Sequence, residues 1–250
     1  MGSLNFIGGE KGGVGKSVAA RVLAQYFIDK GQAFTGYDTD RSHGSFRRFY
    51  GEFASPVIVD SFEGLDRIVA SYDVVTDSAA ADAGAEFASA GAGRVGAHSV
   101  IVDLAAQTAA PLAKWIRDSD LLALMAQLGV AVNFWHLSDG GKDSVDLLDR
   151  LVDTYGAGPN YFVVRNLGRA ADFSHLDDST ALRKALALGA RVFNLDALHE
   201  ASMRKIDHQD TSFWAAVNNR SSADTLGILE RQRVRLWLRN TYETLDRLPL

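Results

Sequence analysis

The chain contains no cysteine among its 250 residues. This absence excludes disulfides, thiolate nucleophiles, and zinc or iron–sulfur sites that depend on cysteine ligands. The six histidines are scattered without the close spacing of a metal-binding helix, so we expect no metal site made by protein side chains alone.

The chain also has no uninterrupted apolar run of the roughly 20 residues that a membrane span requires. Its opening residues, LNFIG, form too short an apolar stretch for a secretory signal, so we expect a cytoplasmic protein. The net charge is −5, from 26 basic and 31 acidic residues. Any nucleic-acid surface must therefore be a local basic patch rather than a property of the whole molecule.

Short apolar runs alternate with helical patterns along the whole chain. This alternation predicts an α/β fold with a doubly wound, mostly parallel sheet and helices on both faces. We expect a single domain over residues 1–250, with a C-terminal helix at 226–248 docked on it. The alanine- and glycine-rich residues 78–96 are compatible with either a loop or a poor helix. The predicted strands are 4–8, 33–38, 57–60, 99–103, 130–137, 160–164 and 190–194, and the clearest predicted helices are 16–30, 111–118, 144–155 and 179–188.

A glycine-rich stretch, IGGEKGGVGKS (residues 7–17), joins the first predicted strand to the first predicted helix. The backbone N–H groups of such a loop and the start of the following helix can bind phosphate oxygens. Lys16 would bridge the terminal phosphates, and the Ser17 hydroxyl would bind Mg²⁺. The usual pattern needs a glycine where Glu10 stands, so the plain phosphate-loop template does not fit. The predicted nucleotide-binding residues of this stretch are Gly12, Gly13, Val14, Gly15, Lys16, Ser17 and Val18.

KGGVGKS resembles the deviant Walker A motif of the ParA/MinD superfamily of ATPases, a class of P-loop NTPases. The resemblance implies ATP and Mg²⁺ as cofactors and a homodimer that forms with ATP. In that family the extra lysine, here Lys11, reaches across the dimer interface to the nucleotide of the other subunit. Lys11 and Lys16 are therefore the expected catalytic cations.

Two later segments resemble further family motifs in the same order. GYDTDRSHGS resembles switch I, in which Asp40 would place the attacking water and join the Mg²⁺ shell as a third catalytic residue, and Asp38 matches the first aspartate. Arg41-Ser42 replaces the usual Pro-Gln, which leaves the hydrolysis rate open. SVIVDLAAQT ends a buried strand in Asp103, the Walker B arrangement that holds Mg²⁺ through a bound water, with residues 104–108 as switch II. VIVD also occurs at 57–60, but the motif order favours Asp103 and leaves Asp60 as a turn residue.

YFVVRNLGR resembles a later family strand after which an asparagine reads the adenine edge, and Asn166 is the candidate. Short further matches, such as Asp38-Thr39-Asp40 after Ala24-Gln25-Tyr26, are most similar to TraL/MobD-like proteins of plasmid conjugation and mobilisation. Iron–sulfur branches of the superfamily are excluded because cysteine is absent.

The resemblance implies a slow Mg-dependent ATPase whose nucleotide-switched dimer positions or partitions a cargo. That cargo would be plasmid DNA, the conjugation or mobilisation machinery, or another cellular complex, held through a protein partner or scaffold. Nonspecific DNA binding would use a basic patch drawn from Arg183, Lys184, Arg191, Arg204 and Lys205. We expect the C-terminal helix to dock on the domain rather than on a membrane. The alternatives are a P-loop kinase or synthetase acting on a small molecule, for which no arginine-rich lid is visible, and a binding module without hydrolysis.

Overall fold

The computed structural model describes residues 2–8, 10–82, 98–220 and 225–250, with side-chain environments for all of these except 73–82. The described strands form one seven-stranded sheet in the order β3-β2-β4-β1-β5-β6-β7, and every neighbouring pair is parallel. The strands are β1 (Ser3–Gly8), β2 (Phe34–Asp38), β3 (Ala54–Pro56), β4 (Ser99–Asp103), β5 (Ala131–Ser138), β6 (Asn160–Asn166) and β7 (Arg191–Leu195).

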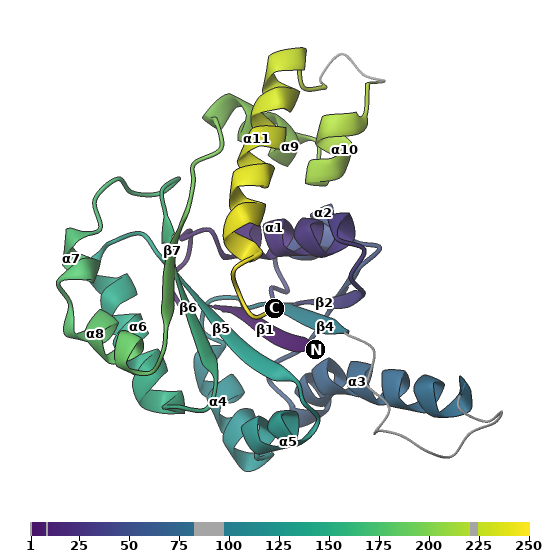
Figure 1. Cartoon of the computed structure of the whole chain (residues 1–250), viewed down its shortest axis with the longest axis vertical. Helices are drawn as coiled ribbons and strands as arrows, with labels where there is room; N and C mark the ends of the chain where they lie inside the picture. The colour runs from purple at the N-terminus through teal and green to yellow at the C-terminus, as the bar shows by residue number, and fades with distance from the viewer. Residues whose placement is uncertain (1, 9, 83–97, 221–224) are drawn as a thin grey trace.

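Helices cover both faces of this sheet (Figure 1). One face carries α3 (Phe62–Asp82), α4 (Ala109–Asp118), α5 (Leu121–Gln127), α6 (Lys142–Tyr155), α7 (Ser174–Asp177) and α8 (Thr180–Ala187). The other carries α1 (Lys16–Asp29), α2 (Ser45–Phe49), α9 (Glu200–His208), α10 (Phe213–Asn218) and α11 (Ile228–Leu245). The predicted doubly wound α/β fold is thus confirmed.

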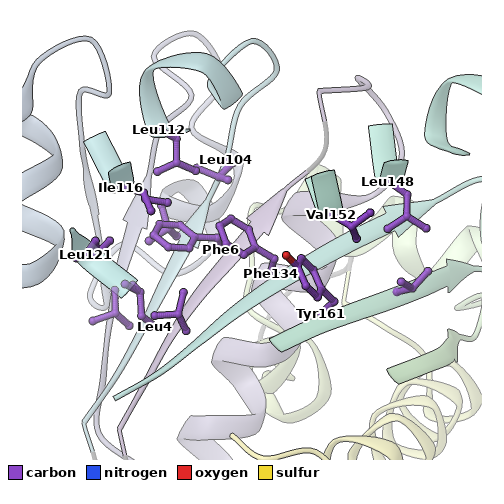
Figure 2. Packing of buried hydrophobic residues seen from close by; sticks show 14 of the residues in the cluster. Leu4, Phe6, Leu104, Leu112, Ile116, Leu121, Phe134, Leu148, Val152 and Tyr161 are labelled. Carbon is purple, nitrogen blue, oxygen red and sulfur yellow. The ribbon is translucent and has the colours of Figure 1, made fainter. Parts of the chain in front are cut away.

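The two faces of the sheet are packed by alternate residues of the same strands. In β5, Phe134 belongs to the core under α4 and α6, whereas the adjacent Trp135 belongs to the core under α1. Figure 2 shows Phe134 between Phe6 and Tyr161. Burial on both sides explains why these strands read as nearly continuous apolar runs.

One predicted strand, 57–60, is wrong. Strand β3 ends at Pro56, opposite Asp38, where β2 also ends. After one more backbone bond, from Val57 N–H to Asp38 O, the segment has no partner strand to pair with and leads into α3. Its apolar alternation reflects burial of Val57 and Val59 against the core while Ile58 is exposed. The other predicted strands and the four predicted helices are confirmed to within about two residues at either end.

The alanine- and glycine-rich segment 78–96 lies mostly outside the described residues, and its first part belongs to α3. The C-terminal helix α11 is buried through Val234, Trp237, Leu238, Thr241 and Leu245, which pack into the core beside α1 and α10. The strand register sets the carboxyl ends side by side, with Ile7 opposite Asp103, Gly8 opposite His136, and Asp38 opposite Asp103. In a parallel sheet this edge is where ligands bind.

Candidate functional site

The glycine loop, residues 10–15, leaves the carboxyl end of β1 and enters α1 at Lys16. Gly13 and Gly15 have φ angles of +77° and +100°, which side-chain-bearing residues rarely adopt. A Cβ atom on Gly12 or Gly13 would have no described heavy atom within 4 Å. The loop therefore surrounds open space with backbone groups and the amino end of a helix, which is the arrangement that binds anions.

Lys16 is 9% exposed, and its Nζ donates to the carbonyl oxygen of Lys11, 2.8 Å away. Burial lowers the pKa of Lys16, and the nearby carboxylates of Asp103 and Asp40 oppose this shift. A partly desolvated ammonium interacts strongly with an anion that replaces lost water contacts.

Asp103 ends β4 next to this lysine and is 5% exposed. Burial raises the pKa of its carboxyl to about 7, and the charge of Asp38 adds to the shift, while a hydrogen bond from Ser17 opposes it. Its Oδ1 atom has no hydrogen-bond partner among the described residues. An unpaired buried carboxylate oxygen is costly unless a cation or donor joins it.

Asp40 lines the space beside the glycine loop, whereas the carboxylate of Asp38 is bound to backbone N–H groups. Asp40 Oδ1 accepts hydrogen bonds from the N–H groups of Ser42 and His43, and its side chain remains 37% exposed. Asp38 is buried, and its carboxylate accepts from the N–H groups of Asp40, Phe46 and Arg47. Asp38 thus holds the start of α2 in place, a positioning role that the D-x-D pattern does not reveal.

Asp60, the alternative to Asp103, lies in an exposed turn between β3 and α3. Its Oδ2 atom pairs with Arg41 at 2.7 Å, and both side chains are well exposed. Its position agrees with the turn role expected for it.

A cleft of about 390 Å³ brings most of the predicted residues together. The cleft also has lining residues that the sequence analysis did not predict, among them three arginines. None of these arginines matches a family motif residue, although Arg169 lies within the segment YFVVRNLGR. The predicted lining residues are Gly12, Gly13, Gly15, Lys16, Ser17, Val18, Asp40 and Asp103; the cationic ones that were missed are Arg21, Arg48 and Arg169.

Arg21 is held within the protein on this side of the cleft. Its guanidinium lies 3.5 Å from the centroid of the Phe49 ring and donates to Asp207 at 2.8 Å. It is 3% exposed, so it stabilises the packing of α1 against α2 and α9 as well as lining the cleft.

Asn166, at the end of β6, contacts the glycine loop directly. Its Nδ2 donates to Val14 O at 2.7 Å, and its Oδ1 accepts from Gly168 N–H at 3.0 Å. A Cβ atom on Gly15 would lie 2.2 Å from that Nδ2, and the φ of +100° would strain any residue with a side chain. Val14 contributes backbone groups to the loop, while its side chain is buried in the core.

A second pocket, of about 750 Å³, adjoins the cleft and shares Gly15, Val18, Arg169 and Asp207 with it. Asn166 lines this pocket together with Leu195, Met203 and Trp237. An elongated ligand with an anionic end at the glycine loop would place its other end here.

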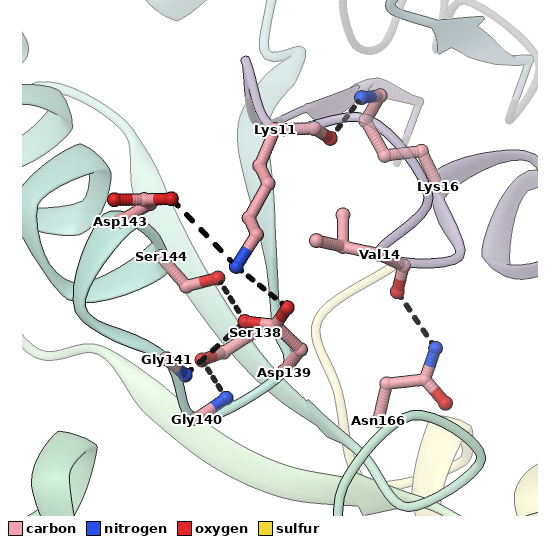
Figure 3. Close-up of polar contacts among 10 residues, drawn as sticks. All are labelled: Lys11, Val14, Lys16, Ser138, Asp139, Gly140, Gly141, Asp143, Ser144 and Asn166. Carbon is pink, nitrogen blue, oxygen red and sulfur yellow. Dashed lines mark hydrogen bonds and ion pairs between the residues drawn. The ribbon is translucent and has the colours of Figure 1, made fainter.

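Lys11 extends away from Lys16 toward the end of β5 (Figure 3). Its Nζ lies 2.7 Å from Asp139 Oδ2 and 4.0 Å from Asp143 Oδ2. The hydrogen bond with Asp139 raises the pKa of Lys11. For Asp139, burial acts to raise the pKa, but the bonds from Lys11, Ser144 and Gly141 outweigh it and lower the pKa to about 2. Neither carboxylate was predicted as part of the site.

The residues suggested for DNA binding lie on different elements and are engaged within the protein. Lys184 of α8 pairs with Asp149 and Asp153, while Arg204 and Lys205 of α9 pair with Glu200 and Glu230. Within the described ranges, no helix is long and apolar enough to cross a membrane.

These features define a doubly wound α/β protein with a glycine loop at the carboxyl edge of a parallel sheet and a cationic, carboxylate-lined cleft beside it. The chain is similar to protein TraL of Escherichia coli, with 22% identity over 258 residues that cover 98% of each chain. No protein-family model matches it.

Two solved structures align with most of this chain. A nucleotide-binding protein from Archaeoglobus fulgidus in complex with ADP is 12% identical, with 84% of this chain and 86% of that chain covered and a TM-score of 0.45. A putative plasmid partition protein from Borrelia burgdorferi B31 bound to AMPPNP is 15% identical, with 96% and 100% covered and a TM-score of 0.46.

Proposed function

We propose that this chain binds Mg-ATP in the cleft and hydrolyses it slowly to ADP and phosphate. The observation that carries the proposal is the convergence of Lys16, Ser17, Asp40 and Asp103 around the open side of the glycine loop. Backbone N–H groups and the buried ammonium of Lys16 suit a polyphosphate, and the adjoining pocket has room for a nucleoside.

The residues present fit a magnesium ion that a phosphate helps to bind. Among the described residues, no group of three or more histidine or acidic side chains could hold a metal alone. Magnesium at nucleotide sites takes one or two protein ligands and completes its shell with phosphate oxygens and waters. Ser17 and Asp103 would hold it, since Asp103 offers an unpartnered oxygen beside the serine hydroxyl, and Asp40 lines the same cleft. When bound, the ion neutralises charge on the terminal phosphates.

The chain's own residues then divide the work around the terminal phosphate. Lys16 would contact phosphate oxygens in exchange for its bond to Lys11 O, and the glycine N–H groups would orient them. Asp40, which is partly exposed, would position the attacking water. The arrangement relies on charge and orientation rather than on a covalent intermediate.

We further propose that ATP promotes a homodimer in which Lys11 reaches the nucleotide of the second subunit, and that this state holds a protein cargo or scaffold. Support comes from the KGGVGKS motif and from the similarity to TraL over nearly the whole chain. The ion pairs around Lys184, Arg204 and Lys205 make a broad DNA surface the weaker choice of cargo.

Release of free phosphate from ATP by the purified chain tests the enzymatic proposal. We expect slow turnover that needs Mg²⁺ and falls on the order of a hundredfold in Lys16→Ala, because that residue contacts the charge that develops in transfer. Lys114→Ala is the matched control, since Lys114 lies on α4 and pairs with the exposed Asp118. Tight ATP binding without phosphate release would contradict the ATPase and favour a binding module. Phosphate appearing only on an added small molecule would favour a kinase or synthetase.

A further inference from the structure

A third cavity, of about 270 Å³, lies on the other face of the sheet from α1, between α4 and α6. It shares Leu104 with the phosphate cleft but is otherwise lined by different residues. The proposed ATP site makes no use of it.

The walls of this cavity are mostly apolar and partly aromatic. Phe134 forms part of the floor and stacks on Tyr155, with 4.4 Å between ring centroids. Leu104 and Leu112 lie on one side of Phe134 (Figure 2). Helix α6 contributes Leu151 to the cavity wall. An apolar cavity of about 150 Å³ is large enough to admit benzene, so this one has room for a single substituted ring.

Several polar side chains also line the cavity, and within the described part of the chain His136 of β5 is the one with an unpaired ring nitrogen. The others are Glu10 of the glycine loop, Thr108, Arg150, Thr154 and Tyr155. His136 is 3% exposed, and its Nε2 atom has no hydrogen-bond partner among the described residues. Buried ring nitrogens normally have a partner, because leaving one unpaired costs the lost interaction with water.

The charge state of His136 fixes what kind of group it can accept. Burial lowers its pKa to about 4, although a hydrogen bond with the backbone of Ser144 and the charge of Asp139 act in the opposite direction. The ring is therefore neutral at pH 7. The hydrogen bond with the Ser144 backbone favours the charged ring, so the ring is the donor in it. Since Nε2 is unpaired among the described residues, the donor is Nδ1. Nδ1 therefore carries the proton, and Nε2 offers a lone pair.

We propose that this cavity is a binding site for a small aromatic molecule that carries one hydroxyl group. The ring packs against Phe134 and Tyr155, and the hydroxyl donates a hydrogen bond to Nε2 of His136. The occupant would also contact Leu104 and Thr108, which flank the segment leading from β4 to α4.

Calorimetric titration of the full nucleotide-free chain with phenol, and with toluene as the isostere that lacks the hydroxyl, tests this site. We expect saturable phenol binding about tenfold tighter than toluene binding, since only phenol satisfies the buried nitrogen. Working without nucleotide separates this result from the fate of the ATPase proposal. Equal affinities, or no saturable phenol binding, would overturn the proposal.

Two variants assign the binding to this cavity. His136→Leu keeps the walls apolar, so the preference for phenol over toluene should disappear. Ala113→Leu adds bulk from α4 and should weaken both ligands at least tenfold while His136 remains in place. Circular dichroism checks that each variant folds, and if His136→Leu does not fold, Ala113→Leu decides alone. Unchanged phenol binding in Ala113→Leu would overturn the assignment.

Discussion

The Nζ atom of Lys11 lies 2.7 Å from Oδ2 of Asp139 in the same subunit. The two residues come from the loop after β1 and the turn after β5, which are neighbouring parallel strands. In this position Lys11 faces the start of α6 rather than the phosphate cleft (Figure 3). If Lys11 serves the nucleotide of a second subunit, as we propose, it must first leave Asp139.

We therefore predict that Asp139→Asn strengthens ATP-dependent dimerisation. The partly exposed ion pair contributes about 0.2–1 kcal/mol, so its loss should tighten the dimer by up to about fivefold. Asparagine keeps the oxygen that accepts from Ser144 and so preserves the start of α6. Analytical ultracentrifugation with ATP measures the change. Asp143→Asn, at 4.0 Å from Lys11, is the control and should have a smaller effect. Equal effects would contradict a specific restraint of Lys11 by Asp139.

Gly15→Ala should destabilise the fold and abolish nucleotide binding. Alanine at this position would have to adopt a φ near +100°, and its Cβ would lie only 2.2 Å from Asn166 Nδ2. We expect unfolding to become easier by about 1–3 kcal/mol, measured by urea denaturation. Gly12→Ala is the matched control, because its Cβ meets no described atom within 4 Å and should leave stability unchanged. A similar loss of stability in both variants would show that the contact with Asn166 is unimportant.

Asn166→Ala should weaken ATP and GTP by similar factors, each roughly tenfold. The amide holds Val14 O and the Gly168 N–H, so its removal loosens the loop that both nucleotides share. Fluorescence titration with labelled analogues of each nucleotide measures the two affinities. A loss confined to ATP would instead establish the adenine contact predicted from the sequence.

Asp103→Asn should stabilise the nucleotide-free protein, and only above mildly acidic pH. Burial raises the pKa of Asp103 to about 7, from an ordinary value near 3.9. The folded state then binds this proton more tightly than the unfolded state, so stability falls as pH rises from about 4 to 7. The variant escapes this loss and should be more stable at pH 8 by a few kcal/mol, at about 1.4 kcal/mol per pKa unit.

Urea unfolding at pH 4.5, 6 and 8 checks this dependence, and the difference between Asp103→Asn and the parent chain should shrink toward acid. Asp146→Asn, which removes the same charge at an exposed position on α6, is the control. A pH-independent difference for Asp103→Asn would mean that its carboxyl is not held at a raised pKa.

The elements and the loop could be predicted because their signals are local. Buried parallel strands read as apolar runs, and glycines before Lys16-Ser17 indicate a phosphate-type loop wherever a strand precedes them. The same local signal led to the wrong prediction of a strand at 57–60. There the side chains alternate between buried and exposed, but no partner strand is present among the described residues to pair with the segment.

The contacts that complete the site could not be predicted, because they depend on which strands become neighbours. Lys11 meets Asp139 only because β1 pairs with β5. The carboxylate of Asp38 accepts hydrogen bonds from N–H groups at the start of α2. A D-x-D pattern does not distinguish such an aspartate from a metal ligand. His136 is one of several scattered histidines in the sequence, and only burial marks it out.

ATP, as we propose, switches this chain into a dimer through Lys11. Multi-angle light scattering of the parent chain and of Lys11→Ala, each with and without Mg-ATP, measures this switch. We expect the mass of the parent chain to double from about 27 kDa when ATP is added. Lys11→Ala should stay monomeric, although it still binds ATP. A Lys11→Ala variant that dimerises with ATP as the parent does, or a parent chain whose mass does not change with ATP, would show that Lys11 is not the switch.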